Sequence, residues 1–180
     1  MDNMVIRETL PGDLEAVLEV VRAAFGSNEE VSLVHDLLND PSAEPRLSLL
    51  AFNDDQPAGH ILFTNAILDP IQPVMISILG PLAVIPDAQK QGVGGRLIQE
   101  GFQRLIAADI KWVFVLGHSS YYPRFGFSPA LAMGFDPPFP IPGEFTDAWM
   151  AINLLPSCVE TSHGTVKPCN AFNYPQYWGE

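Results

Sequence analysis

Residues 79–105 read LGPLAVIPDAQKQGVGGRLIQEGFQRL, and this stretch decides the fold. It continues an apolar run that begins at Met75, and the run predicts a buried strand over residues 75–84. A loop with three glycines in four residues follows, Gly92-Val93-Gly94-Gly95. Beyond the loop, helical spacing predicts an amphipathic helix whose apolar face contains Leu97, Ile98, Gly101, Phe102, Leu105 and Ile106.

A strand, a glycine loop and the start of a helix together favour the binding of an anion. Glycine has no Cβ to hold a phosphate away from the backbone. The first N–H groups of a helix have no partner within it and lie at the positive end of its dipole. Lys90 and Arg96 would add positive charge. We therefore predict a pyrophosphate site in the loop formed by Gln89, Lys90, Gln91, Gly92, Val93, Gly94 and Gly95.

Two nucleotide-binding motifs are excluded at this loop. A P-loop requires a Gly-Lys pair followed by Ser or Thr, but Gly95 is followed by Arg96 and Leu97. A dinucleotide fingerprint that starts at Gly92 would need a third glycine where the chain has Leu97. Neither motif accounts for the loop.

The spacing Gln89-x-x-Gly92-x-Gly94 resembles the coenzyme A loop of the GNAT superfamily of N-acetyltransferases, whose pattern is Arg/Gln-x-x-Gly-x-Gly/Ala. Further on, residues 122–127, YPRFGF, resemble the Tyr-x-x-x-Gly-Phe element of the same family. The resemblance covers residues 6 to about 127 well. It implies a GNAT-like α/β fold: a central, mixed and mostly antiparallel sheet flanked by helices, with strands that splay apart at the acyl-CoA site.

The rest of the chain has the order of an α/β protein. Two helices are expected between Pro11 and Pro41, the second starting at a capping-box spacing of Ser27 and Glu30. Four prolines in residues 135–143 predict an irregular crossing. Further strands are predicted over residues 5–9, 47–52, 58–68, 112–116 and 149–155.

The length of 180 residues fits a single compact body. We place an N-acetyltransferase domain at residues 1–156 and an aromatic C-terminal extension at residues 157–180. The extension contains Tyr174, Tyr177 and Trp178, so we expect it to pack on the domain or on a partner subunit, which leaves a homodimer open.

Composition excludes several classes of partner. The formal net charge is −12, from 21 acidic and nine Lys or Arg residues without a basic cluster, which argues against binding of nucleic acid. The negative charge either attracts cationic partners such as amines or serves solubility alone. Without a long uncharged apolar run or a signal peptide, we expect a cytoplasmic protein that does not enter membranes. The two cysteines, Cys158 and Cys169, form no disulfide framework, and no Cys/His spacing predicts a metal site.

The resemblance also implies roles in catalysis. Leu82, Ala83 and Val84 would hold the pantetheine arm through main-chain hydrogen bonds, and an N–H near Val84 would stabilise the thioester oxyanion. Tyr122 matches the family tyrosine that protonates the leaving thiolate. The adjacent Tyr121 is the alternative for this role, and we expect one of the two tyrosines to be a packing residue.

The general base is less defined. Some amine acetyltransferases have histidines on the strand before Leu-Ala-Val, where this chain has Ile78 and Gly80. His118, after the strand over residues 112–116, is the candidate that we favour, because imidazole titrates near neutral pH. Glu29 and Glu30 could reach the acceptor side from the second helix, and a water relay is a further alternative.

We therefore predict an acetyl-CoA-dependent N-acetyltransferase that moves an acetyl group to a primary amine of a small molecule or protein. Direct attack is favoured over an acyl-cysteine, because neither cysteine is near the motifs. The alternative is a non-catalytic acyl-CoA-binding or sensor domain. The missing strand histidines favour that alternative, and Tyr122 argues against it.

Overall fold

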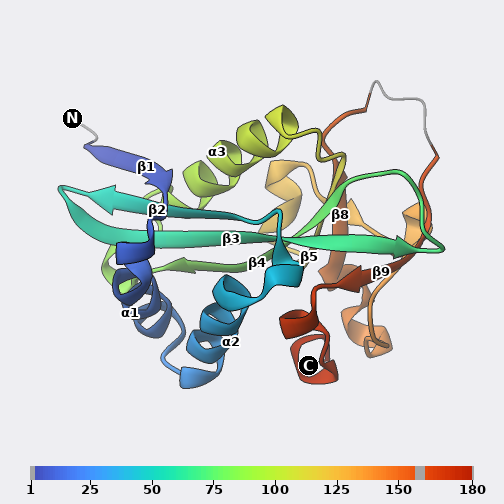
Figure 1. Cartoon of the computed structure of the whole chain (residues 1–180), viewed down its shortest axis with the longest axis horizontal. Helices are drawn as coiled ribbons and strands as arrows, with labels where there is room; N and C mark the ends of the chain where they lie inside the picture. The colour runs from blue at the N-terminus through green and yellow to red at the C-terminus, as the bar shows by residue number, and fades with distance from the viewer. Residues whose placement is uncertain (1–2, 157–160, 180) are drawn as a thin grey trace.

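The computed structural model describes residues 3–156 and 161–179, and its centre is one mixed sheet (Figure 1). The strands in chain order are β1 (Met4–Glu8), β2 (Leu47–Asn53), β3 (Gln56–Asp69), β4 (Ile76–Val84), β5 (Trp112–Leu116), β6 (Ser128–Pro129), β7 (Phe135–Asp136), β8 (Trp149–Asn153) and β9 (Gly164–Pro168). Their order in the sheet is β1-β2-β3-β4-β5-β8-β6, with β9 paired to β3 and β7. The pairs β4–β5 and β7–β9 are parallel, and the other pairs are antiparallel.

Helices cover both faces of this sheet. α1 (Leu14–Phe25) and α2 (Asn28–Asn39) lie on one face and α3 (Val93–Ala107) on the other (Figure 1). α1 ends at Gly26, whose φ of 67° is easy for glycine and unfavourable for other residues. The mixed, mostly antiparallel sheet with flanking helices confirms the fold predicted from the sequence.

The start of α2 differs in detail from a capping box. α2 begins directly after Ser27, as the spacing predicts, but the Ser27 hydroxyl donates to the Glu30 carboxylate and makes no hydrogen bond to a backbone N–H. The predicted apolar face of α3 is also too wide by one residue. Ile106 is 41% exposed, because α3 turns that position away from the sheet, whereas Leu97, Ile98 and Leu105 are buried.

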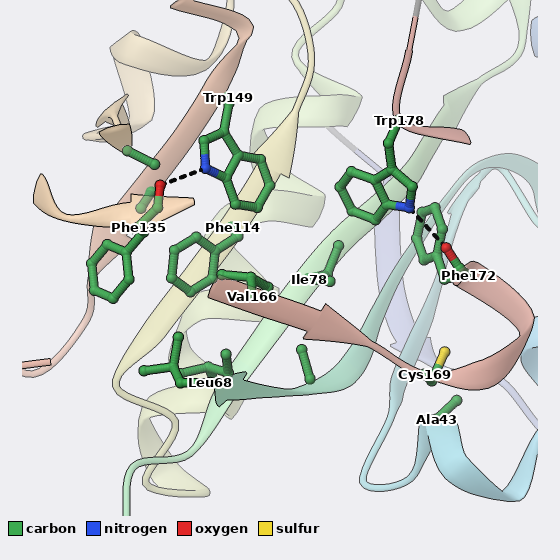
Figure 2. Close-up of a cluster of buried hydrophobic side chains, with 14 of the residues drawn as sticks. Ala43, Leu68, Ile78, Phe114, Phe135, Trp149, Val166, Cys169, Phe172 and Trp178 are labelled. Atoms are coloured by element: carbon green, nitrogen blue, oxygen red, sulfur yellow. Dashed lines mark hydrogen bonds between the residues drawn. The ribbon is translucent and has the colours of Figure 1, made fainter. Parts of the chain in front are cut away.

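The core on the face of α1 and α2 includes a large aromatic cluster that the end of the chain completes. Trp178 is buried against Trp149, with 5.9 Å between ring centroids, and against Phe172, at 5.0 Å. The indole Nε1 of Trp178 donates to the Phe172 carbonyl, and that of Trp149 donates to the Phe135 carbonyl (Figure 2). The last described residues thus pack in the same core as β5 and β8.

The C-terminal segment is tied to the body by backbone hydrogen bonds as well. β9 pairs with the end of β3, and the Asp40 carboxylate at the end of α2 accepts the Ala171 N–H at 2.8 Å. The boundary expected between residues 156 and 157 and the residue Cys158 lie outside the described residues. Among the described helices, none is long and apolar enough to cross a bilayer.

Candidate functional site

The centre of the site is the place where β4 and β5 part. Their parallel pairing ends at Ile78 and Phe114, although β4 continues to Val84. The splayed strands predicted from the sequence are therefore present. Beyond this point β4 is paired on its β3 side only, so an open edge faces the gap.

The backbone groups of Leu82 and Val84 face this gap. The Ile85 N–H donates to the Ala58 carbonyl of β3 at 3.0 Å. The direction of the backbone N–H and C=O groups alternates along a strand. The backbone groups of Ala83 therefore also point toward β3, and those of Leu82 and Val84 point away from β3. The Ala83 side chain is buried in the core under α1 and α2, so Ala83 contributes to neither side of the gap.

The amino end of α3 lies beside the same gap. Gly92 precedes the helix with a φ of 84°, and the first N–H groups, those of Val93, Gly94 and Gly95, have no carbonyl partner inside the helix. The Gln89 side chain donates its Nε2–H to the Val84 carbonyl at 3.0 Å, which fixes the loop to the end of β4. The helix end and the open strand edge thus both direct backbone N–H groups toward the same gap.

The three glycines of this loop have different roles. A Cβ on Gly92 would meet no atom within 4 Å, so this position is open to a ligand. A Cβ on Gly94 would lie 2.6 Å from the Tyr121 hydroxyl oxygen, and one on Gly95 would lie 3.2 Å from the Phe125 ring. All three glycines line the large cavity, so the prediction that they leave space for a phosphate stands as a prediction, and the absence of a Cβ at Gly94 and Gly95 also leaves room for the aromatic rings of Tyr121 and Phe125.

Two adjacent tyrosines follow β5 and have different environments. The Tyr122 ring is buried beneath Gly117, and its hydroxyl makes no hydrogen bond to any other described residue. Burial raises the pKa of Tyr122 well above its ordinary value of 10, and the neighbouring Tyr121 adds to the shift. Tyr122 is therefore protonated at neutral pH and able to donate.

Tyr121 lies closer to the loop. Its pKa is also raised by burial, while the nearby Arg124 acts in the opposite direction. The Arg124 guanidinium carbon is 4.8 Å from the centre of the Tyr121 ring. Tyr121 and Arg124 together cover the start of α3, with the Tyr121 hydroxyl against Gly94.

These groups line one cavity of about 1220 Å³. It contains both residues predicted to take part in catalysis, Tyr122 and His118. It also contains all residues predicted to bind the cofactor except two: Ala83 faces the core, and Gln91 is directed at the loop itself, where its side chain donates to the Asp87 carbonyl at 2.8 Å. The side chains of Ala83 and Gln91 therefore do not line the cavity, and their part in the cofactor site stays a prediction.

A smaller cavity of about 250 Å³ lies on the side of α1 and α2. The two cavities meet at the gap between β4 and β5 and beside the C-terminal segment, since both are lined by Phe25, Leu79, Gly80, Pro81, Leu116, Gln176, Tyr177 and Trp178. Glu29 and Glu30 line it, together with residues of the C-terminal segment. His118, by contrast, lines the large cavity only and is exposed just beyond β5.

The other histidines and the described cysteine lie outside both cavities. His60 is fully buried and its Nε2 is 2.8 Å from the Ser48 hydroxyl oxygen. Cys169 is buried, and burial raises the pKa of its thiol to about 11, so it is a poor nucleophile. Within residues 3–156 and 161–179 there is no group of three or more His, Cys, Asp or Glu side chains that could bind a metal.

Several residues that line the large cavity were not predicted from the sequence. Arg124 is inside the quoted YPRFGF element, and its charge beside a proposed anion site was a usable signal. Phe25, Phe145 and Tyr177 carry no motif and come from three separate parts of the chain, so only the tertiary structure reveals them.

Comparison with known proteins agrees with this geometry. The model of the acetyltransferase (GNAT) family matches residues 14–127. YjhQ of Escherichia coli K12, an uncharacterized N-acetyltransferase, is 46% identical over 144 residues, which cover 79% of this chain and 80% of that protein. YhbS of the same strain, also an uncharacterized N-acetyltransferase, is 33% identical over 130 residues, which cover 71% of this chain and 75% of that protein.

Two solved structures extend the similarity over nearly the whole chain. The crystal structure of Escherichia coli YhbS in complex with CoA has a TM-score of 0.86 and 27% identity, covering 97% of this chain and 94% of that one. A GNAT family acetyltransferase from Brucella melitensis in complex with acetyl-CoA has a TM-score of 0.75 and 29% identity, covering 96% and 99%. The family match and these relatives establish that this chain belongs to the GNAT acetyltransferase family.

Proposed function

We propose that this protein binds acetyl-CoA in the large cavity and transfers its acetyl group directly to the amino group of a second substrate. The observation that carries the proposal is the open edge of β4. The cavity beside this edge extends from the amino end of α3, where backbone N–H groups are free, to Tyr122. A cavity of this form suits a long thioester that has a pyrophosphate at one end. The two solved relatives with bound CoA and acetyl-CoA support this choice of cosubstrate.

The pyrophosphate would lie at the start of α3, where the backbone N–H groups are unpaired and Lys90 and Arg124 supply positive charge. The pantetheine arm would pair with the backbone of Leu82 and Val84. A backbone N–H at the end of β4 would then stabilise the negative charge that develops on the thioester oxygen.

In the transfer step, the amine nitrogen attacks the carbonyl carbon, a C–N bond forms and the C–S bond breaks. Tyr122 donates its hydroxyl proton to the sulfur, and CoA leaves as the thiol. His118 is the base that we propose for the amine proton, and Glu29, Glu30 and water remain the alternatives. An acyl-cysteine at Cys169 has no support, since that thiol lines neither cavity.

Thiol release from acetyl-CoA with a panel of primary amines tests the proposal. We expect free CoA and the N-acetylated amine in equal amounts, and saturable binding of acetyl-CoA by calorimetry. Desulfo-CoA should bind and release no thiol. Absence of acetyl-CoA binding would contradict the proposed function, and binding without transfer to any amine would favour a non-catalytic acyl-CoA sensor.

We also propose that the protein acts in the cytoplasm, where acetyl-CoA is made and used. Cell fractionation with an antibody against the chain tests this location. A homodimer stays a prediction, and sedimentation of the purified protein tests it.

A further inference from the structure

The smaller cavity adjoins the proposed point of acetyl transfer from the opposite face of the sheet. It meets the large cavity at Gly80 and Pro81 of β4 and Leu116 of β5, where the two strands have already parted. A molecule in the smaller cavity would therefore reach the thioester through the gap, while the cofactor approaches from the side of α3. This arrangement makes the smaller cavity the acceptor site of the proposed reaction.

Charge is divided between the two ends of the joined cavities. The basic side chains that line them, Lys90 and Arg124, are at the loop before α3 and the turn after β5. The acidic ones, Glu29 and Glu30, are on the first turn of α2 at the other end. Glu30 accepts a hydrogen bond from Ser27, whereas Glu29 has no hydrogen bond or ion pair with any described residue. The acceptor end therefore has a carboxylate that could bind a cation, and its described lining contains no Lys or Arg that could bind an anion.

The remaining wall of the acceptor end is apolar and aromatic. Phe25 at the end of α1 lines both cavities and is 41% exposed, although large apolar side chains are normally buried. Tyr177 also lines both cavities and is packed against Phe172, with 5.9 Å between ring centroids. Trp178 anchors the segment that carries Tyr177 in the aromatic core (Figure 2).

We propose that the acceptor is a small primary monoamine with an apolar or aromatic body and no carboxylate. This inference rests on the proposed function, since it assigns the second substrate of the same site. The ammonium group would bind Glu29 before it loses its proton, and the body would pack on Phe25 and Tyr177.

Other amine classes fit this wall less well. A polyamine or an amino sugar has several polar or charged groups, and the lining offers two carboxylates of which one is already engaged. An amino acid would place its carboxylate beside Glu29, and the cations of the cavity are at the cofactor end. A protein lysine would bring peptide groups against the exposed Phe25 ring and the other apolar residues of the lining, which cannot pair with them.

Matched probes separate the two recognition elements. 2-Phenylethylamine and 2-phenylethanol differ in the cationic group, and 2-phenylethylamine and ethylamine differ in the apolar body. By calorimetry, with and without desulfo-CoA, we expect 2-phenylethylamine to bind. We expect 2-phenylethanol and ethylamine each to bind at least about tenfold more weakly. In acetylation assays, kcat/KM for 2-phenylethylamine should exceed that for ethylamine, spermidine, phenylalanine and a lysine-containing peptide by about 10²-fold.

Variants locate the recognition. Glu29→Gln keeps the shape and removes the charge, so KM for 2-phenylethylamine should rise about tenfold while KM for acetyl-CoA stays unchanged. Phe25→Ala should reduce the preference for 2-phenylethylamine over ethylamine. Glu15→Gln is the matched control, because Glu15 is an exposed acid on α1 that lines neither cavity.

The outcomes distinguish this inference from the proposed function. Faster acetylation of spermidine, phenylalanine or the peptide, or equal binding of 2-phenylethanol, would overturn the acceptor assignment and leave acetyl transfer intact. Amine binding that is lost in Glu29→Gln, with no acetyl transfer, would support the amine site and contradict the transferase. An unchanged KM in Glu29→Gln would remove Glu29 from the site.

Discussion

The hydroxyl oxygen of Tyr121 would lie 2.6 Å from a Cβ placed on Gly94. A Cβ on Gly94 would therefore conflict with an aromatic side chain from beyond β5 unless Tyr121 moved. This relationship joins the two sequence motifs of the chain, which are about one strand apart, at a single contact. It also changes what a substitution at Gly94 would mean, because the steric conflict is with Tyr121 before it is with a phosphate.

The first prediction uses this contact as a double-mutant cycle. Alanine is a better helix former than glycine by about 0.5–1 kcal/mol, but Gly94→Ala would press against the Tyr121 hydroxyl. We expect Gly94→Ala to weaken acetyl-CoA binding about tenfold in the parent and to stabilise the Tyr121→Phe protein, where the next ring atom is 3.8 Å away. Calorimetry and urea unfolding measure the two effects. Equal effects in both backgrounds would show that Tyr121 is not responsible.

The second prediction separates the two tyrosines. Tyr122→Phe removes a hydroxyl that has no partner among the described residues, so the fold and acetyl-CoA affinity should be retained. If Tyr122 protonates the leaving thiolate, kcat should fall by about 10²-fold or more. Tyr121→Phe should leave kcat within a few-fold of the parent. Steady-state assays of thiol release decide, and a reversed pattern would exchange the two roles.

The third prediction concerns His118. An alkylamine with a pKa near ~10.4 is almost wholly protonated at neutral pH and must lose a proton before it attacks. If His118 takes this proton, log kcat/KM should rise with pH through a limb that deprotonation of the free amine does not account for. His118→Ala should remove that limb and leave a rise that follows deprotonation of the free amine. A His118→Ala profile that overlays the parent would leave Glu29, Glu30 or water as the base.

The fourth prediction concerns stability and the buried His60. Burial lowers the pKa of His60 from 6.5 to about 3, so the folded protein excludes a proton that the unfolded chain takes up near pH 6.5. The stabilisation of the neutral form is complete above pH 6.5 and is lost as the pH falls from 6.5 toward 3. This one group should lower the free energy of unfolding by about 1.4 kcal/mol per pH unit across that window.

Urea unfolding between pH 4 and pH 8 measures this slope, with His60→Gln as the control that cannot titrate. The carboxyl of Asp13 does not interfere, because its hydrogen bond from Arg7 lowers its pKa to about 2, and its contribution is lost only below about pH 4. Parallel pH profiles of the parent and His60→Gln would contradict the assignment.

Part of the lining of the large cavity was predictable, because that part depends on local sequence pattern. The apolar run before Val84, the glycines before α3 and the helical spacing after them are contiguous, and each acts through backbone conformation or the helix end. The same holds for Tyr122, which a short motif places directly after β5. Local patterns could not reveal that β4 faces the gap through Leu82 and Val84 and faces the core through Ala83, since that depends on the pairing with β3.

The α/β fold follows from periodicity in the sequence, and the resemblance of two short motifs to the GNAT family predicts the coenzyme A loop and the tyrosine beside it. The contact between Gly94 and Tyr121 and the composition of the proposed acceptor wall emerge only in the tertiary structure. Phe25, Glu29 and Tyr177 are spread over some 150 residues of chain and lie on no motif. Packing of the C-terminal segment against β5 and β8 brings them together, and burial of Trp178 is a long-range interaction that no local pattern encodes.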